Sequence, residues 1–350
     1  MTYPWSWYTD SDVLRAEEDR IFARSWQYVG HAGELAQPGD YFATTIGRTP
    51  LVLTRAEDGK LRAFVNVCRH RGSVVVEGAG NRATLQCPYH AWTYALDGRL
   101  RAAPRADFEL DEVSLVPVRL EQWGPFLFAN ADADAAPLAE ALDAVPAEVV
   151  ECGVDVDALR FHHRAEWTVD ANWKLACENF LECYHCPVAH KGFSALVDVS
   201  PDAYRLDSRG FVSSQYGPVR ENGRARYDTA GEVLRSQFHF LFPNTAVNVL
   251  PGRANLSIGS FAPDRPERTR RVLDYFFAPD AEDAWIEELL AFDDEVGRED
   301  TVLVERVQRG VAAGAIDGGR LVGDAEQLVA HFQSLVAAAL AHYRPTNSVT

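Results

Sequence analysis

The chain has no long hydrophobic run and no excess of positive charge, and both absences narrow the classes of protein to consider. No apolar segment approaches the roughly 18 residues that a membrane-spanning helix needs, so we expect no membrane partner. With 34 Lys and Arg against 51 Asp and Glu, the formal net charge is −17, which argues against a nucleic-acid partner. The first residues contain neither a basic region nor an apolar core, so we expect a cytoplasmic protein without a signal peptide.

Cysteine is also scarce, and two cofactor fingerprints are missing. Six cysteines in 350 residues are too few for a disulfide framework, so we expect those that bind no metal to be reduced thiols. The chain has no G-x-G-x-x-G fingerprint and no plant-type ferredoxin spacing. It is therefore not expected to bind NAD(P)H or flavin itself.

The order of predicted elements indicates an α+β fold with two domains. A helix over 13–26 precedes short β-branched segments at 41–47, 49–55 and 61–67, and the Asp-Gly pairs at 58–59 and 97–98 signal hairpins. Further strands are expected over 235–277, and helices over 173–186, 283–311 and 326–343. We predict a helical N-terminus (1–26) that packs with the second domain, a small antiparallel β-domain (27–132), and a second domain with an antiparallel sheet flanked by helices (133–350).

Two Cys/His pairs in the first domain have the spacing of a metal centre. The pairs read Cys68-x-His70 and Cys87-x-x-His90, and sixteen residues separate them. A structural zinc ion would fit such a set, and so would a [2Fe–2S] cluster with two thiolates on one iron and two imidazoles on the other. The single residue inside the first pair and the glycines of the intervening loop favour the cluster.

A second group of metal-binding residues lies in the second domain. On a continuous helix Glu178, Glu182 and His185 share one face, because they are separated by four and three residues. Pro187 is expected to bend the chain and bring His190 back towards His185. Two histidines and one carboxylate would form a facial triad, which binds non-haem Fe(II) and leaves positions open for O₂ and substrate.

The motifs CRHRG, CPYHAW and NWKLACENFLECYHCPVAH resemble those of the Rieske non-haem iron oxygenases. The resemblance implies that Cys68 and Cys87 hold one iron of a Rieske [2Fe–2S] cluster and that His70 and His90 hold the outer iron. Imidazoles in place of thiolates reduce the negative charge and raise the reduction potential. The 27–132 segment is then the Rieske domain, and 133–350 is the catalytic domain.

The same resemblance implies roles in the catalytic domain. His185 and His190 occupy the positions of iron ligands, Glu182 that of the bridging acid between subunits, and Asn179 that of a neighbouring asparagine. The family's third ligand is an acidic residue followed five positions later by Glu and then by Gln. Asp300 matches this pattern, with Glu305 and Gln308 after it; Glu299 is the second choice.

The resemblance also implies an activity and partners. A separate flavin and iron–sulfur reductase or a ferredoxin would supply electrons that originate from NAD(P)H. With O₂, a small organic substrate would then be hydroxylated, dihydroxylated or oxidatively demethylated. A homotrimer would join the cluster of one subunit to the iron of the next. The alternative is a Rieske ferredoxin that carries electrons without oxygenase activity.

With glutamate rather than aspartate in the bridging position, the motif resembles that of the branch that acts on carnitine, choline and glycine betaine. An aromatic compound also remains a candidate substrate. A cationic substrate needs aromatic faces and a carboxylate. The aromatic candidates in the sequence are Tyr204, Phe211, Tyr216, Phe238 and Phe240.

Overall fold

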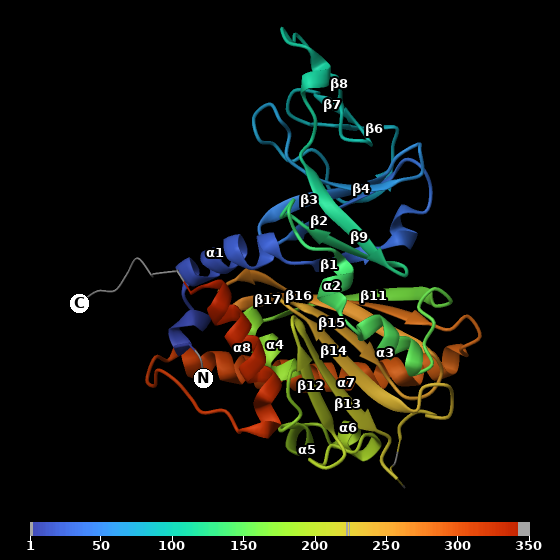
Figure 1. The fold of residues 1–350 in the computed structure, drawn as a ribbon, viewed down its shortest axis with the longest axis vertical. Coiled ribbons are helices and arrows are strands. Elements are labelled where there is room, and N and C mark those ends of the chain that lie inside the picture. The colour runs from blue at the N-terminus through green and yellow to red at the C-terminus, as the bar shows by residue number, and fades with distance from the viewer. Residues whose placement is uncertain (1–2, 222, 224, 342–350) are drawn as a thin grey trace. The chain divides into compact units, whose positions relative to one another are not determined.

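The structure is a computed structural model that describes residues 3–221, 223 and 225–341 (Figure 1). It divides into two compact units, residues 22–138 and residues 139–341 together with 3–21. The predicted boundaries at 26/27 and 132/133 lie within a few residues of these limits. No helix in the described part of the chain has an apolar stretch long enough to cross a membrane.

The unit of residues 22–138 consists of two antiparallel sheets. The larger sheet has the strand order β1-β10-β9-β4-β3-β2-β5, and the smaller has the order β6-β7-β8. Three short 3-10 helices, η2 (Phe22–Arg24), η3 (Ala32–Leu35) and η4 (Leu110–Glu112), complete the unit. The strands are β1 (Gln27–His31), β2 (Asp40–Ile46), β3 (Thr49–Arg55), β4 (Leu61–Val65), β5 (Ala79–Asn81), β6 (Thr84–Gln86), β7 (Thr93–Ala95), β8 (Leu100–Ala102), β9 (Pro117–Trp123) and β10 (Phe126–Asn130).

The predicted hairpins are present at both Asp-Gly pairs. Gly59 (φ 75°) joins β3 to β4, and Gly98 (φ 87°) joins β7 to β8. A β-carbon at Gly98 would lie 2.4 Å from a ring carbon of Phe64, so this turn needs glycine for space as well as for its backbone angle.

The second unit is built on a seven-stranded antiparallel sheet with the order β11-β17-β16-β15-β14-β13-β12. Figure 1 shows α7 running along the sheet. The strands are β11 (Arg160–Val169), β12 (Arg205–Arg209), β13 (Val212–Pro218), β14 (Arg235–Leu241), β15 (Thr245–Val249), β16 (Asn255–Arg265) and β17 (Arg268–Phe277). The helices are α1 (Ser11–Arg20), α2 (Leu138–Leu142, at the unit boundary), α3 (Val145–Glu151), α4 (Trp173–Phe180), α5 (Cys186–Ala189), α6 (Lys191–Leu196), α7 (Asp283–Ala312) and α8 (Gln327–Ala339), with 3-10 helices η1 (Trp5–Tyr8) and η5 (Asp324–Glu326). The α+β prediction is therefore correct.

Residues 3–21 are tied to the second unit by buried polar contacts. Glu17 and Lys174 form an ion pair at 2.6 Å, and both side chains are fully buried. The indole N–H of Trp173 donates to the other oxygen of Glu17 at 2.7 Å. Two tyrosines, Tyr3 and Tyr8, donate to the buried Glu178 carboxylate. Removal of one member would leave a buried charge without its partner, so these contacts define a single arrangement of the N-terminal helix.

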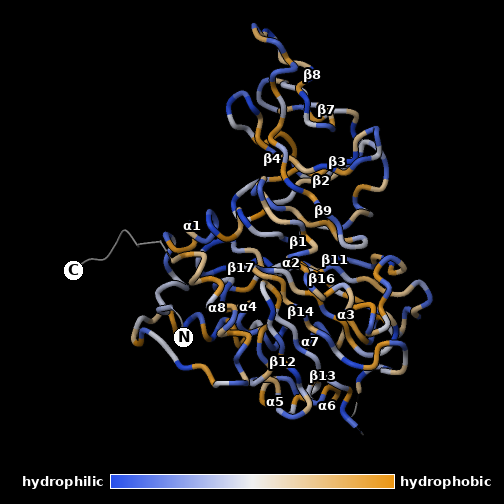
Figure 2. Tube along the Cα trace, in the orientation of Figure 1, coloured by the Kyte–Doolittle hydropathy of each residue, from blue (hydrophilic) through white to orange (hydrophobic). Residues whose placement is uncertain are grey.

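The helix predictions differ from the structure mainly at their ends. Asn172 caps α4 by accepting a hydrogen bond from the backbone N–H of Lys174 at 3.0 Å. The predicted helix over 173–186 is wrong beyond residue 180. The segment 283–311 forms one helix, and Figure 2 shows apolar and polar residues interspersed along α1, α7 and α8, as expected for helices with one buried face. Residues 342 and 343 of the last predicted helix lie outside the described residues.

Candidate metal centres

The two Cys/His pairs lie on loops with the same backbone conformation. In loop Cys68–Ser73 and in loop Cys87–Trp92, the first N–H donates to the last carbonyl at 2.8 Å. The fifth residue of each loop, Gly72 or Ala91, has a positive φ of 75° or 59° and donates its N–H to the cysteine carbonyl at 3.1 Å. Alanine is rare in this conformation. The second loop nevertheless has the same shape as the first, although it has the side chain of Ala91 where the first loop has glycine.

Burial separates the four candidate cluster ligands into two types. Cys68 and Cys87 are free thiols that are 3% and 2% exposed. His70 is exposed and His90 is half-buried, and their ring centroids are 4.5 Å apart. Sulfur ligands inside and imidazoles at the surface fit a [2Fe–2S] cluster whose outer iron faces solvent or a partner.

The surroundings of Cys87 favour its thiolate form. Burial acts to raise the pKa of Cys87, but backbone N–H donors of residues 89 and 90 and the side chain of Cys68 outweigh it and lower that pKa. Tyr94 accepts the N–H of Arg69 at 3.0 Å, and its hydroxyl lies 3.3 Å from the Cys68 sulfur. The Tyr94 hydroxyl is thus held at the Cys68 sulfur, a contact that the sequence does not reveal.

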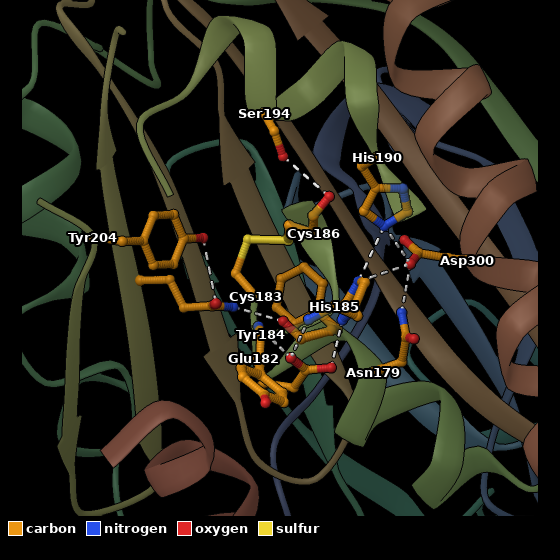
Figure 3. Close-up of a disulfide and its surroundings, with 12 residues drawn as sticks. Asn179, Glu182, Cys183, Tyr184, His185, Cys186, His190, Ser194, Tyr204 and Asp300 are labelled. Atoms are coloured by element: carbon orange, nitrogen blue, oxygen red, sulfur yellow. Dashed lines mark hydrogen bonds and ion pairs between the residues drawn. A yellow bond between two sulfur atoms is a disulfide. The ribbon is translucent and has the colours of Figure 1, made fainter. Parts of the chain in front are cut away.

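The second unit brings three further candidate ligand atoms together. The Nε2 atoms of His185 and His190 are 3.0 Å apart. Oδ1 of Asp300 lies 2.9 Å from Nε2 of His190 and 3.4 Å from Nε2 of His185. The three atoms lie within 4.8 Å of one another. His185 precedes α5, His190 lies between α5 and α6, and Asp300 projects from α7 (Figure 3).

Each of these three residues is oriented by another side chain. A carboxylate oxygen of Glu182 contacts Nδ1 of His185. Oε2 of Glu299 lies 2.7 Å from Nδ1 of His190. The amide of Asn179 donates to Oδ1 of Asp300 at 2.7 Å. Such partners fix the ring orientation and tautomer of a metal ligand and raise its basicity. Glu299, the second choice for the third ligand, therefore faces the outer nitrogen of His190.

The electrostatics of this cluster call for a cation. Burial alone would raise the pKa of Asp300, but hydrogen bonds to His185 and His190 lower it to about 2. Burial alone would lower the pKa of His185, but Asp300 and Glu182 raise it to about 9. Three carboxylates around two imidazoles leave an excess of negative charge. Two imidazole nitrogens and one carboxylate oxygen form the donor set that non-haem Fe(II) sites use, so the residues fit that ion.

The chain segment that carries Glu182 and His185 is a turn, not a helix. Helix α4 ends at Phe180, and the Glu182 carboxylate accepts the backbone N–H groups of Tyr184 and His185. This pairing gives the backbone an alternative to helical hydrogen bonds. Glu178, predicted to share their face, instead points to Tyr3 and Tyr8.

The expectation of reduced thiols is wrong for two cysteines. Cys183 and Cys186 form a disulfide across this turn, with their Cα atoms 4.9 Å apart (Figure 3). That Cα distance is within the usual range for a disulfide, and two cysteines three residues apart reach it because the chain turns between them. Cys152 and Cys177 are free thiols, as expected.

A cavity of about 450 Å³ opens beside the three ligand atoms. Two of the five predicted aromatic candidates, Tyr204 and Phe238, line it. Phe211, Tyr216 and Phe240 do not. The cavity has four further aromatic residues that sequence reasoning missed. Trp167 and Tyr275 lie on β11 and β17, far along the chain from the metal-binding motif, whereas Phe180 ends α4 and Phe193 lies on α6, three residues after His190.

Comparison with known proteins gives a family match for each of the two domains. Residues 25–116 match the Rieske [2Fe-2S] domain, and residues 156–342 match the family described as "Ring hydroxylating alpha subunit (catalytic domain)". The carnitine monooxygenase oxygenase subunit of Escherichia coli is 36% identical over 96% of this chain and 93% of its own. The chloroplastic choline monooxygenase of Spinacia oleracea is 33% identical over 95% of this chain and 76% of its own.

A solved structure of the quaternary ammonium Rieske monooxygenase CntA with L-carnitine superimposes with a TM-score of 0.82, at 32% identity over 96% of this chain and 95% of its own. The match to a catalytic domain excludes the alternative of an electron carrier without oxygenase activity. The chain belongs to the Rieske non-haem iron oxygenases, as the oxygenase component that takes electrons from a separate reductase and uses O₂ at a mononuclear iron.

Proposed function

We propose that this oxygenase is a monooxygenase of quaternary ammonium compounds. The observation that carries the proposal is a half-buried carboxylate, Asp293, in an aromatic-walled cavity beside the His185, His190 and Asp300 cluster. The Tyr275 hydroxyl donates to Asp293 at 2.6 Å. A quaternary ammonium group has no N–H to donate, so it is recognised by aromatic faces and by an anion nearby.

Electrostatics support a cationic ligand at Asp293. Burial raises the pKa of Asp293, although Tyr275 and Arg271 act in the opposite direction. A bound cation would stabilise the ionised carboxylate. Carnitine and choline, for which two relatives are named, are both quaternary ammonium compounds. A neutral aromatic substrate would bring no positive charge to this carboxylate.

We further propose that Cys68, His70, Cys87 and His90 hold the cluster and that His185, His190 and Asp300 hold Fe(II). When bound, this iron supplies the centre at which O₂ is activated with two electrons. The chain's own contribution is orientation. Glu182 and Glu299 hold the outer nitrogens of the two rings, and Asn179 holds one oxygen of Asp300. The aromatic walls keep water away from the substrate.

The proposed assembly is a homotrimer in which electrons pass from the cluster of one subunit to the iron of the next. The structure of one relative, a quaternary ammonium Rieske monooxygenase, is described as giving insight into inter-subunit electron transfer. Glu182, bonded to His185 and 13% exposed, is the proposed link to the cluster of a neighbouring subunit. Sedimentation of the loaded protein tests the trimer, and a monomer with full turnover would contradict it.

The link through Glu182 is tested by Glu182→Gln, which keeps the size of the side chain and removes its charge. We expect both metal centres to stay loaded and the donor to reduce the cluster at the normal rate. Cluster reoxidation with substrate and O₂, followed by stopped flow, should slow by orders of magnitude. Reoxidation at full speed with all iron bound would remove Glu182 from the electron path.

We also propose a cytoplasmic location, supported by the four free cysteines. Because cytosolic proteins seldom keep disulfides, the Cys183–Cys186 disulfide of the structure should be found opened to two thiols in freshly lysed cells. Thiol alkylation before and after reduction, read by mass spectrometry, tests this. A fully oxidised pair under those conditions would argue for another compartment.

The substrate class is tested by O₂ uptake coupled to product mass, with a donor system that reduces the cluster. Carnitine, glycine betaine and choline form one group, and naphthalene and benzoate form the other. We expect coupled turnover only in the first group. Turnover of an aromatic compound without turnover of any quaternary amine would overturn the proposal.

Asp293→Asn provides the site-specific test, because it keeps the shape and removes the charge. It should raise KM for the quaternary amine more than tenfold and leave the iron content unchanged. Asp283→Asn, an exposed substitution in the first turn of the same helix, is the matched control. Equal KM values for both variants would exclude Asp293 from cation binding.

A further inference from the structure

Arg271 is a buried cation whose side chain has no hydrogen-bonded or ion-pair partner in the part of the chain that the structure describes. It lies on β17, lines the cavity beside the proposed iron site, and is 8% exposed. Its Nη1 atom is fully buried and has no hydrogen-bond partner among the described residues, none of which forms an ion pair with it. Charged side chains this deeply buried are normally paired, because desolvation is otherwise uncompensated.

Aromatic residues on the two neighbouring strands hold the guanidinium. Trp167 on β11 and Phe261 on β16 pair with Arg271 in the sheet. The Arg271 Cζ lies 5.4 Å from the ring centroid of Trp167 and 3.4 Å from that of Phe261. Ring faces stabilise the charge, but they cannot accept the five N–H bonds in the guanidinium plane. The edge of the group is therefore left for a planar anion, which guanidinium binds in a bidentate manner.

The acidic residues near Arg271 are already engaged. Asp300 accepts from Asn179 and contacts the two histidines. Asp293 accepts from Tyr275. Burial lowers the pKa of Arg271 to about 10, and Tyr275 and the two aspartates act against this shift. Arg271 is therefore still protonated at neutral pH and provides a permanent positive charge in the cavity.

We propose that Arg271 binds a carboxylate of the substrate, so that the substrate is a betaine with a quaternary ammonium group at one end and a carboxylate at the other. The inference rests on the proposed function, because it assigns the ammonium group to Asp293 and the aromatic walls. Two anchors of opposite charge define both the position and the direction of the substrate. Choline, which has a hydroxyl in place of the carboxylate, would leave the guanidinium unpaired.

The test measures equilibrium binding to the metal-loaded enzyme without O₂, by calorimetry. The probes are γ-butyrobetaine and its methyl ester, which share the ammonium group and the chain length and differ in the negative charge. We expect the wild type to bind the acid at least about 30-fold more tightly than the ester, because one charge-assisted bidentate contact is lost. Arg271→Gln should bind the two probes with equal affinity.

Two further variants make the result specific. Arg270→Gln removes the same charge from the adjacent, exposed position of β17 and should keep the wild-type preference. Arg271→Lys keeps the charge without the bidentate edge and should recover part of the preference. If Arg271→Gln fails to fold, the probe pair on the wild type and on Arg271→Lys still decides the outcome.

Two results would overturn the inference in different ways. Equal binding of acid and ester by the wild type, or an unchanged preference in Arg271→Gln, would remove the carboxylate from Arg271 and leave the quaternary ammonium assignment intact. Failure of the wild type to bind either probe, with choline and glycine betaine also inactive, would overturn the proposed function itself and the betaine assignment with it.

Discussion

Two adjacent carboxylates on α7, Glu299 and Asp300, are expected to affect iron very differently. Oδ1 of Asp300 faces the Nε2 atoms of both histidines, whereas Oε2 of Glu299 contacts the opposite nitrogen of His190 at 2.7 Å. On the proposed assignment, Asp300→Ala removes an iron ligand and leaves the Asn179 amide without its acceptor. Glu299→Gln removes only the charge that orients a ligand.

The expected magnitudes follow from these positions. Loss of a group that orients a metal-bound histidine typically lowers metal affinity about 10- to 100-fold, or about 1.4 to 2.8 kcal/mol. Glu299→Gln should therefore bind iron at saturating concentration and lose it to a weaker chelator than the wild type requires. Asp300→Ala should have no mononuclear iron at any practical concentration.

Iron content measured along a series of competing chelators separates the two cases. The wild type should contain about three irons per chain and Asp300→Ala about two, because the cluster alone holds two. The visible spectrum of the cluster is the internal standard in every sample. Glu288→Gln, at an exposed position of α7, controls for the change of charge. If Asp300→Ala keeps three irons and Glu299→Gln loses one completely, Glu299 is the ligand.

Three further predictions concern the cluster, the N-terminal helix and a buried histidine. His70→Cys should lower the reduction potential sharply, because a thiolate adds negative charge at the outer iron; an unchanged spectrum and potential would exclude His70 as a ligand. Lys174→Met leaves the Glu17 carboxylate buried without its cation and should lower the free energy of unfolding, measured by urea titration, by about 3–5 kcal/mol. Adding Glu17→Gln should recover part of this loss. A loss below about 1 kcal/mol in the single variant would contradict the reasoning. Burial lowers the pKa of His239 from its ordinary 6.5 to about 4, so the unfolded state binds the proton more tightly. The free energy of unfolding should therefore fall as the pH drops from 6.5 to 4, by up to about 1.4 kcal/mol per pH unit. His239→Gln should flatten this slope, and an identical slope in the variant would contradict the assignment of the pH dependence to His239.

Most parts of the site that the sequence predicted are those in which the information is local; Asp300, which lies 110 positions from His190, came instead from the resemblance to the family. The two cluster loops and the His185–His190 segment each lie within about two dozen residues of continuous chain, and their spacing is readable without a fold. The contact of Glu182 with His185 was also expected, but on a helix that is absent. The carboxylate reaches the ring across a turn, because its own hydrogen bonds to two backbone N–H groups stop the helix.

The parts that could not be predicted depend on tertiary pairing. Glu299 lies 109 positions from His190, and Arg271 meets Trp167 only through the register of β17 with β11. The signal for Tyr94 is also structural, since its hydroxyl turns towards Cys68 from the adjoining β7 strand. The disulfide is not predicted because six cysteines are too few for a disulfide framework, and its formation depends on the turn between Cys183 and Cys186.

Helix α7 carries both the proposed iron ligand and the proposed ammonium anchor, and the helical repeat places them on the same face. Asp293 and Asp300 are seven residues apart, which is close to two turns and about 10 Å of helical rise. Both therefore lie on the face that lines the cavity, and Gly297 lines it between them. A β-carbon at Gly297 would meet no atom within 4 Å, so the missing side chain adds open volume between the two carboxylates. Because each added residue rotates a helix by about 100°, an insertion between the two aspartates would turn one of them away from the cavity. The proposed ammonium anchor and the proposed iron ligand thus depend on the same uninterrupted helix.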